Sequence, residues 1–103
     1  MSVTMIMRWP GVTSEQYDRV CALAETVDNP PPGLICHIAA FDDAGLRVTD
    51  VWESAEDFQR YAEQRLMPAV GQVGLPGEPS VEICGVHCIL SPALESLTPA
   101  AKG

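Results

Sequence analysis

The stretch LICHIAAFDDAGLRVTDVWE, residues 34–53, decides the fold of this chain. It contains two runs rich in apolar and β-branched residues, separated by Asp42-Asp43-Ala44-Gly45. Such runs predict β-strands, and a break of acidic and glycine residues between them predicts a hairpin turn. We therefore expect antiparallel strands at 34–41 and 46–53.

The register of this hairpin brings two polar side chains together. A turn centred on Asp43 and Ala44 places His37 directly opposite Asp50, with Cβ atoms about 4.5–5.5 Å apart. A carboxylate at that distance holds an imidazole in one tautomer, as a general base requires. We predict that His37 and Asp50 are catalytic. The alternative is a structural His–Asp hydrogen bond, and a slip of one residue would cancel the pairing.

The segments on both sides of the hairpin complete a βαββαβ order. Their periodicity predicts a strand at 3–9, a helix within 12–27, a helix at 55–66 and a final strand at 81–90. This is the ferredoxin-like arrangement, an α+β fold with a four-stranded antiparallel sheet and both helices on one face. We expect one domain over 1–90, followed by a weakly patterned C-terminal tail at 91–103 that is free to be mobile.

Local signals mark the ends of the two helices. Thr13 and Gln16 have the spacing of a capping box at the start of the first helix. Ser54 is a favourable N-cap for the second helix. Pro68 is expected to end or kink the second helix, with a short further turn after it.

Charge and length exclude several classes of function. The chain has 103 residues with six basic and fourteen acidic side chains, which gives a net charge of −8. Nucleic acids and anionic membranes both attract basic surfaces, so we predict neither as a partner. No apolar run approaches the roughly 20 residues of a membrane span, and the N-terminus has no recognisable signal peptide. We therefore predict a cytoplasmic protein whose four cysteines are reduced.

Alternation along the strands sorts their side chains onto two faces of the predicted sheet. One set suits the face under the helices: Val3, Met5, Met7, Leu34, Cys36, Ile38, Ala40, Thr49, Val51, Cys84, Val86, Cys88 and Leu90. The other set is expected on the open face: Thr4, Ile6, Arg8, Ile35, His37, Ala39, Phe41, Val48, Asp50, Trp52, Ile83, Gly85, His87 and Ile89. Because that face is too apolar to be left in water, we predict a homodimer in which a second copy covers it and encloses a ligand cavity.

Cys84, His87 and Cys88 in VEICGVHCIL (residues 81–90) raise the question of a metal site. On a strand with about 3.3 Å per residue, Cys84 and Cys88 lie roughly 13 Å apart. Both thiolates then cannot reach one zinc ion at about 2.3 Å, and His87 points to the other face. We predict no metal site here, and reduced core cysteines instead.

With these elements in place, the chain resembles the dimeric α/β-barrel superfamily, and within it the antibiotic-biosynthesis-monooxygenase-like proteins. The resemblance rests on the element order over residues 1–90, on DVWESAEDFQRY (residues 50–61), and on the closing strand with His87. It implies a homodimer that binds ligands between the sheet and the helices or inside the barrel.

The resemblance also bears on cofactors. In haem-degrading members of that superfamily, a tryptophan at the end of the third strand works with a histidine in the following helix. Trp52 matches the tryptophan, but the helix at 55–66 contains no histidine. Haem degradation is therefore not expected, and we predict no cofactor. The activity that the resemblance implies is cofactor-independent oxygenation of aromatic, polyketide-like substrates.

Four further residues are candidate ligand contacts. Arg8 or His87 would stabilise a developing oxyanion, Trp52 would stack against a flat ring, and Phe41 lies on the same expected face. The first hypothesis is an enzyme, a cofactor-free monooxygenase or isomerase, in which His37 removes a proton from a small, largely apolar, aromatic substrate. The second hypothesis is a non-catalytic ligand-binding or structural dimer with the same cavity.

Overall fold

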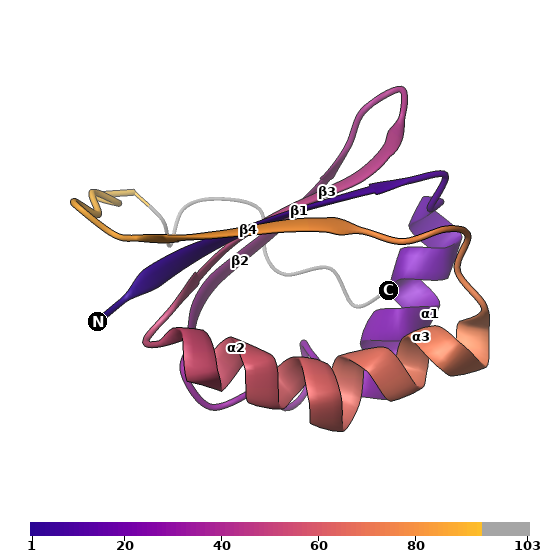
Figure 1. Ribbon diagram of the computed structural model, residues 1–103, viewed down its shortest axis with the longest axis horizontal. Coiled ribbons are helices and arrows are strands. Elements are labelled where there is room, and N and C mark those ends of the chain that lie inside the picture. The colour runs from indigo at the N-terminus through magenta and orange to yellow at the C-terminus, as the bar shows by residue number, and fades with distance from the viewer. Residues whose placement is uncertain (94–103) are drawn as a thin grey trace.

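The computed structural model describes residues 1–93 and contains one four-stranded antiparallel sheet with helices on one face (Figure 1). Its elements are β1 (Val3–Pro10), α1 (Ser14–Ala24), β2 (Leu34–Phe41), β3 (Gly45–Trp52), α2 (Ala55–Tyr61), a π-helical turn η1 (Ala62–Leu66), α3 (Met67–Val73) and β4 (Ser80–Gly85). The strands lie in the order β2-β3-β1-β4. The predicted α+β ferredoxin-like fold is confirmed, while residues 94–103 of the predicted tail lie outside the described residues.

The hairpin between β2 and β3 has the predicted register from Cys36 to Phe41, with His37 opposite Asp50, but a bulge at the start of β2 places Leu34 rather than Ile35 opposite Trp52. Its turn is held by the side chain of Asp42, whose Oδ1 accepts hydrogen bonds from the backbone N–H groups of Ala44 at 2.8 Å and Gly45 at 3.1 Å. These two hydrogen bonds lower the pKa of Asp42. The turn chemistry of the sequence therefore fixes which residues of the two strands face each other.

The helix α1 begins where the sequence signals predict. The Thr13 hydroxyl accepts from the Gln16 backbone N–H at 3.2 Å, and the Gln16 side chain accepts from the Thr13 backbone N–H at 3.0 Å. This capping box satisfies two amides that have no partner within the helix. The helix ends at Ala24, earlier than expected, because Glu25 adopts the left-handed conformation with φ 57°.

Pro68 explains the unusual middle of the second helical region. Proline has no N–H and its ring clashes with the carbonyl four residues earlier, so a regular α-helix cannot run through it. The chain widens into η1, in which the Met67 N–H bonds to the carbonyl of Ala62, and α3 then starts with Pro68 in its first turn. The predicted kink at Pro68 takes this form.

The strand β4 is shorter than the predicted strand 81–90. It pairs with β1 as far as Val3 and Gly85, where β1 begins. Beyond that point the Val86 N–H still bonds to the Ser2 carbonyl at 3.0 Å. The chain then runs past the N-terminal end of β1 (Figure 1), so the last residues of the predicted strand lie outside the sheet.

The two faces of β2, β3 and β4 are the reverse of our expectation, except at Leu34, which the bulge in β2 keeps on the covered face as expected. The strand β1 has the predicted orientation, with Met5 buried under the helices. The register pairs Met5 with both Asp50 and Ile83, so these two share the covered face, whereas Ile38 is 54% exposed on the other. The helix-covered face carries Val3, Met5, Met7, Trp9, Leu34, His37, Ala39, Leu46, Val48, Asp50, Trp52, Val81 and Ile83.

The reversal has a physical reason. We expected His37 and Asp50 on the face away from the helices because the other set of residues is mostly apolar, and an unpaired polar group is costly to bury. Polar groups that hydrogen-bond to each other carry little of that cost, so they can lie in the interior. Every buried side-chain nitrogen and oxygen among the described residues has a hydrogen-bond partner.

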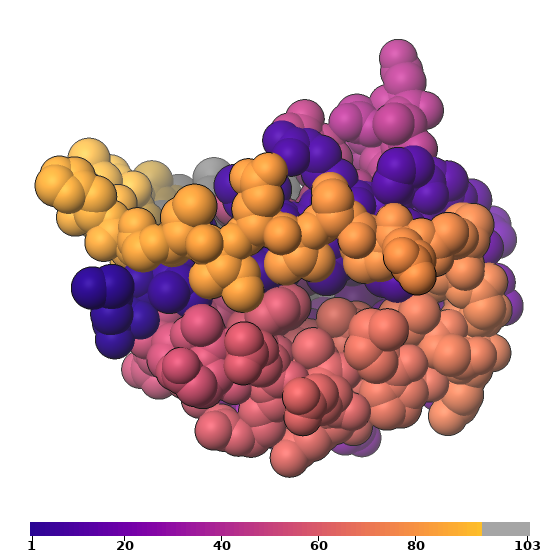
Figure 2. Space-filling view, in the orientation of Figure 1, coloured from indigo at the N-terminus to yellow at the C-terminus, as the bar shows by residue number. Residues whose placement is uncertain are grey.

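The two edge strands of the sheet are β2 and β4. All six residues of β4 are exposed. Figure 2 shows β4 along the front of the molecule, above α2 and α3. Among the residues described, no helix is long and apolar enough to cross a membrane.

Substitution of Gly45 tests the close approach of the hairpin to β1. Gly45 has φ +147°, and a Cβ there would lie 2.6 Å from the Trp9 carbonyl oxygen. Gly45→Ala is therefore expected to lower the free energy of unfolding by about 1–3 kcal/mol in urea denaturation. Gly71→Ala is the matched control, because a Cβ at Gly71 in α3 meets nothing within 4 Å and alanine favours helix interiors. Equal stability of the two variants would contradict this account.

Candidate functional site

A cavity lies between the sheet and the helices. Its volume is about 50 Å³, and it is partly open to solvent. The enclosed part has room for a few water-sized molecules and is smaller than the roughly 300–1,000 Å³ typical of small-molecule sites. An aromatic ligand would need the open part as well. The lining is mainly apolar, and no Lys or Arg belongs to it among the described residues.

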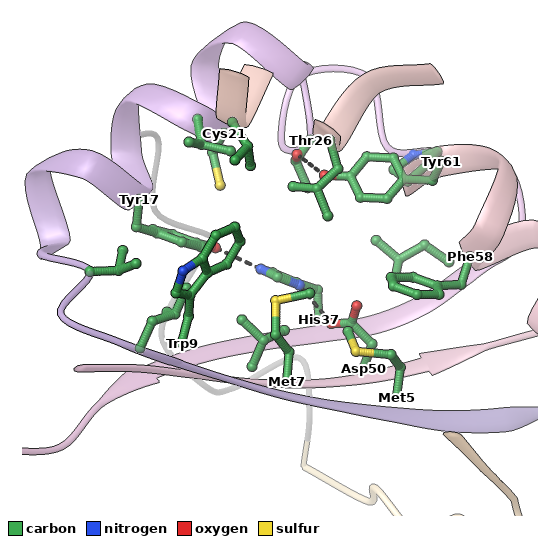
Figure 3. A pocket seen from close by; sticks show the side chains of 18 of the residues that line it. Met5, Met7, Trp9, Tyr17, Cys21, Thr26, His37, Asp50, Phe58 and Tyr61 are labelled. Atoms are coloured by element: carbon green, nitrogen blue, oxygen red, sulfur yellow. Dashed lines mark hydrogen bonds and ion pairs between the residues drawn. The ribbon is translucent and has the colours of Figure 1, made fainter. Parts of the chain in front are cut away.

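Three polar side chains form a hydrogen-bonded chain in the wall of this cavity (Figure 3). Asp50 Oδ1 lies 2.6 Å from His37 Nδ1, and His37 Nε2 lies 2.6 Å from the Tyr17 hydroxyl oxygen. A carboxylate only accepts hydrogen bonds, so Nδ1 carries the proton and Nε2 of the neutral ring accepts the hydrogen of Tyr17. The predicted juxtaposition of His37 and Asp50 is confirmed, and their catalytic role stays a prediction.

Trp52 secures Asp50 from the other side. Its indole Nε1–H donates to Asp50 Oδ2 at 3.0 Å, and the two residues are 1% and 3% exposed. Both carboxylate oxygens therefore have partners, as a buried carboxylate requires. The Trp52 ring contacts Phe58 and Tyr61, with centroids 5.7 and 5.6 Å away. Trp52 lines the cavity, and its polar edge orients Asp50.

The Tyr17 ring approaches His37 end-on. The two rings are 4° from parallel with centroids 6.1 Å apart, so the hydroxyl reaches Nε2 close to the plane of the imidazole, where its lone pair lies. Burial raises the pKa of Tyr17, and the neighbouring Cys21 thiol adds to the effect. Tyr17 is therefore a neutral phenol that donates its hydrogen. Phe41 packs edge-on against Tyr17 and is 43% exposed.

A second polar group lies on the helix wall, across the cavity from His37 and Asp50 (Figure 3). The hydroxyl oxygens of Thr26 and Tyr61 are 2.6 Å apart, and both residues are buried. Burial raises the pKa of Tyr61 to about 12, although the hydrogen bond with Thr26 opposes the rise. Burial also raises the pKa of the Cys21 thiol, against hydrogen bonds with Tyr17 and Thr26.

Two predicted ligand contacts lie away from the cavity. Arg8 is on the open face of the sheet, where its Nη1 lies 4.0 Å from Glu82 Oε1. His87 follows the end of β4 and is exposed. The expectation that Arg8 and His87 share a face with His37 is therefore wrong, because the covered face of β2 and β3 turns His37 inward and away from both.

The predicted fate of the cysteines is partly wrong. Cys21 is buried, as expected of a core cysteine, but Cys84 and Cys88 are exposed. Cys84 lies on β4 and Cys88 beyond its end. Within residues 1–93, no group of three or more His, Cys, Asp or Glu side chains is placed to hold a metal ion.

Sequence reasoning assigned Tyr17 and Tyr61 to packing and gave Thr26 no role. The two tyrosines lie on the apolar stripes of α1 and α2, where an aromatic ring normally serves packing. Their hydroxyls gain a role only through partners on other elements of the fold. The available signal is that both tyrosines of the chain lie on helix faces that are buried, where a hydroxyl needs a partner.

Comparison with known proteins bears on the fold. No protein-family model and no curated protein matches the sequence. SnoaB of Streptomyces nogalater, described as a cofactor-independent oxygenase, has a TM-score of 0.64 at 18% identity over 86% of this chain and 96% of that one. ActVA-Orf6 of Streptomyces coelicolor, a monooxygenase solved with the ligand nanaomycin D, has a TM-score of 0.57 at 16% identity over 88% and 91%. The chain has the same fold as these two proteins.

The same fold also occurs in a protein of unknown function. A dimeric ferredoxin-like protein of unknown function from Thermobifida fusca has a TM-score of 0.60 at 15% identity, over 84% of this chain and 92% of that one. At such identities the likeness establishes the fold. The chemistry has to be argued from the cavity itself.

The raised pKa of Tyr61 predicts a loss of stability at alkaline pH. Tyrosine in the unfolded chain ionises near its ordinary value of 10.0, and Tyr61 in the folded chain ionises at about 12. Between these values the native state keeps a proton that the unfolded state has lost, so the free energy of unfolding falls as pH rises. Tyr61→Phe is expected to flatten this fall in urea denaturation between pH 10 and 12. An unchanged slope would show that Tyr61 does not cause it.

Proposed function

We propose that the cavity binds a small, neutral, largely apolar aromatic molecule and that the chain of Tyr17, His37 and Asp50 removes a proton from it. The observation that carries this proposal is the unbroken hydrogen-bonded path from a buried carboxylate through an imidazole to a phenol in the cavity wall. Asp50 fixes the tautomer that leaves Nε2 as an acceptor, which is the condition for a general base.

The charge of the cavity favours a neutral ligand. Asp50 contributes a carboxylate to the wall, and no Lys or Arg lines the described cavity. A ligand carboxylate or phosphate would therefore meet negative charge without a fixed positive partner. The net charge of −8 acts in the same direction at longer range. Rings of Trp9, Trp52 and Phe58 in the lining suit a flat, apolar ligand.

The proton moves through Tyr17, because Nε2 of His37 is already bonded to its hydroxyl. A substrate C–H bond breaks as its proton forms an O–H bond with the Tyr17 oxygen, and the proton of Tyr17 forms an N–H bond with His37. The electron pair stays on the substrate as an enolate, and Asp50 stabilises the imidazolium.

Two reactions can follow from this enolate. An isomerase returns the proton to another carbon. A cofactor-free monooxygenase lets the anion react with dioxygen, which converts a methylene to a carbonyl and forms one water. The descriptions of SnoaB and ActVA-Orf6 as oxygenases favour the second reaction.

A ligand-binding protein without catalysis is the second candidate. The same hydrogen bonds tie β2 to β3 and to α1, so they could serve as a brace. Every buried side-chain nitrogen and oxygen among the described residues has a hydrogen-bond partner, which favours the structural role. Measurement of proton removal separates the two candidates.

Exchange of the α-hydrogens of 2-indanone in deuterium oxide tests the base directly. The protein is expected to accelerate deuterium uptake, measured by mass spectrometry, and His37→Asn and Tyr17→Phe are expected to reduce this acceleration by about 100-fold or more. His87→Asn is the matched control, because His87 is the other histidine of the chain and is exposed outside the sheet. A wild-type rate equal to that of buffer, or full activity of His37→Asn, would refute the proposal.

Asp50→Asn separates the tautomer argument from folding. An asparagine can still accept from Trp52, but its NH₂ group would face Nδ1 and reverse the tautomer of His37. We expect a large loss of exchange with a small change in melting temperature. Loss of folding together with exchange would instead support the structural brace.

We also propose that the open face of the sheet joins two copies of the chain. No described helix covers this face (Figure 1), and Ile6, Ile38 and Val51 lie on it. Its charged residues lie toward one end of the strands: Arg8 and Arg47 are directly opposed, and Glu82 on β4 lies 4.0 Å from Arg8. A sheet face of this composition is typical of an interface. The description of the Thermobifida fusca protein as dimeric is consistent with it.

Substitution on the open face tests the homodimer. Ile38 is 54% exposed at the centre of β2, and Ile38→Asp is expected to convert a dimer to a monomer in analytical ultracentrifugation. Leu23→Asp is the matched control, because Leu23 is 50% exposed but lies on α1. A monomeric wild-type protein, or a dimer lost only in the Leu23 variant, would contradict the proposed interface.

A further inference from the structure

We infer that the hydroxyl pair of Thr26 and Tyr61 binds the oxygen atom of the ligand, on the wall opposite His37. The inference rests on the proposed function, because it concerns the same ligand in the same cavity. It gives these hydroxyls the role of stabilising an oxyanion, which the sequence suggested for Arg8 or His87. Those two residues lie away from the cavity and cannot fill that role.

The pair has hydrogen-bonding capacity beyond its mutual bond. Two hydroxyls together hold two hydrogens and several lone pairs, and the 2.6 Å bond between Thr26 and Tyr61 uses one hydrogen. Cys21, which lines the same cavity and interacts with Thr26, offers this second hydrogen a thiol sulfur. Sulfur is a weak acceptor, so a ligand oxygen can compete for that hydrogen.

The placement of the pair suits an enolate. Figure 3 shows the hydroxyls of Thr26 and Tyr61 on the helix wall, and His37 with Asp50 on the strand wall. A ketone held between the walls can turn an α-hydrogen toward Tyr17 and its carbonyl oxygen toward the pair. Removal of the proton moves negative charge onto that oxygen, and a hydrogen bond to it strengthens as the charge develops.

The fold holds the pair in place before any ligand binds. Arg65 in η1 donates to the backbone carbonyls of Ala24 at 3.5 Å and Asn29 at 2.5 Å, which flank the turn that carries Thr26. Tyr61 is the last residue of α2, directly before η1. Donors that are fixed in advance lose little freedom when charge develops, and π-helical turns often occur at functional sites.

A pair of matched ligands tests this inference. Indane and 2-indanone have the same rings and differ by one carbonyl oxygen. Binding of each can be followed by the indole N–H resonances of Trp9 and Trp52, the two tryptophans of the chain, which both line the cavity. The variant is Thr26→Val with Tyr61→Phe, because replacement of both partners by apolar groups of similar shape leaves stability nearly unchanged.

The double variant is expected to bind 2-indanone about three- to tenfold more weakly and indane with unchanged affinity. Its rate of deuterium exchange into 2-indanone is expected to fall by about tenfold or more, because the hydroxyls act most strongly on the enolate. If the double variant does not fold, Tyr61→Phe alone replaces it, and the same loss confined to 2-indanone is expected.

The outcomes separate this inference from the function on which it rests. Equal weakening of indane and 2-indanone, or no weakening of either, would overturn the role of Thr26 and Tyr61 while the exchange by wild-type protein still supports the base. Absence of both binding and exchange in the wild-type protein would overturn the proposed function and this inference together.

Discussion

The burial of the Asp50 carboxylate is the constraint on which the rest of the site depends. A carboxylate without partners in an apolar interior is costly, so each of its oxygens must accept a hydrogen bond. Trp52 supplies one partner from the same strand and His37 supplies the other from the neighbouring strand. His37 in turn needs a donor for its second nitrogen, and Tyr17 on α1 provides it. One buried charge thereby connects two strands and a helix.

Because each buried polar group needs a partner, the polar side chains of the cavity lie on two opposite walls. The strands carry the carboxylate and imidazole, while the helical side carries the hydroxyls of Tyr17, Thr26 and Tyr61. The apolar side chains between them lower the polarity of the space, which strengthens each polar interaction that a ligand makes there. Pro68 contributes indirectly, since the π-helical turn that accommodates it follows Tyr61 and carries Arg65 to the turn of Thr26.

The open face of the sheet has a different character from the covered one. The covered face carries Met5, Val48 and Trp52, each 5% exposed or less, whereas Ile38 on the open face is half exposed. Both faces are apolar enough to be buried, which is why composition alone does not distinguish them. The one-sided placement of the helices leaves the second face for another partner (Figure 1).

The sequence by itself determined the order of the elements, the capping of α1 and the register of the hairpin, since these depend on residues close together in the chain. The turn at Asp42 and the capping box at Thr13 are such local interactions, and both place their partners where the sequence predicts. The approach of His37 to Asp50 follows from the same local register. Only the tertiary structure decided which face of the hairpin the helices cover. That choice depends on the pairing of β1 with β3 and on the hydrogen bond between Tyr17 and His37, which join segments distant in the sequence. The tertiary structure also placed Arg8 and His87 away from the cavity and brought Thr26 to Tyr61. These residues are far apart in sequence, so their separation or contact is decided only when the helices pack on the sheet.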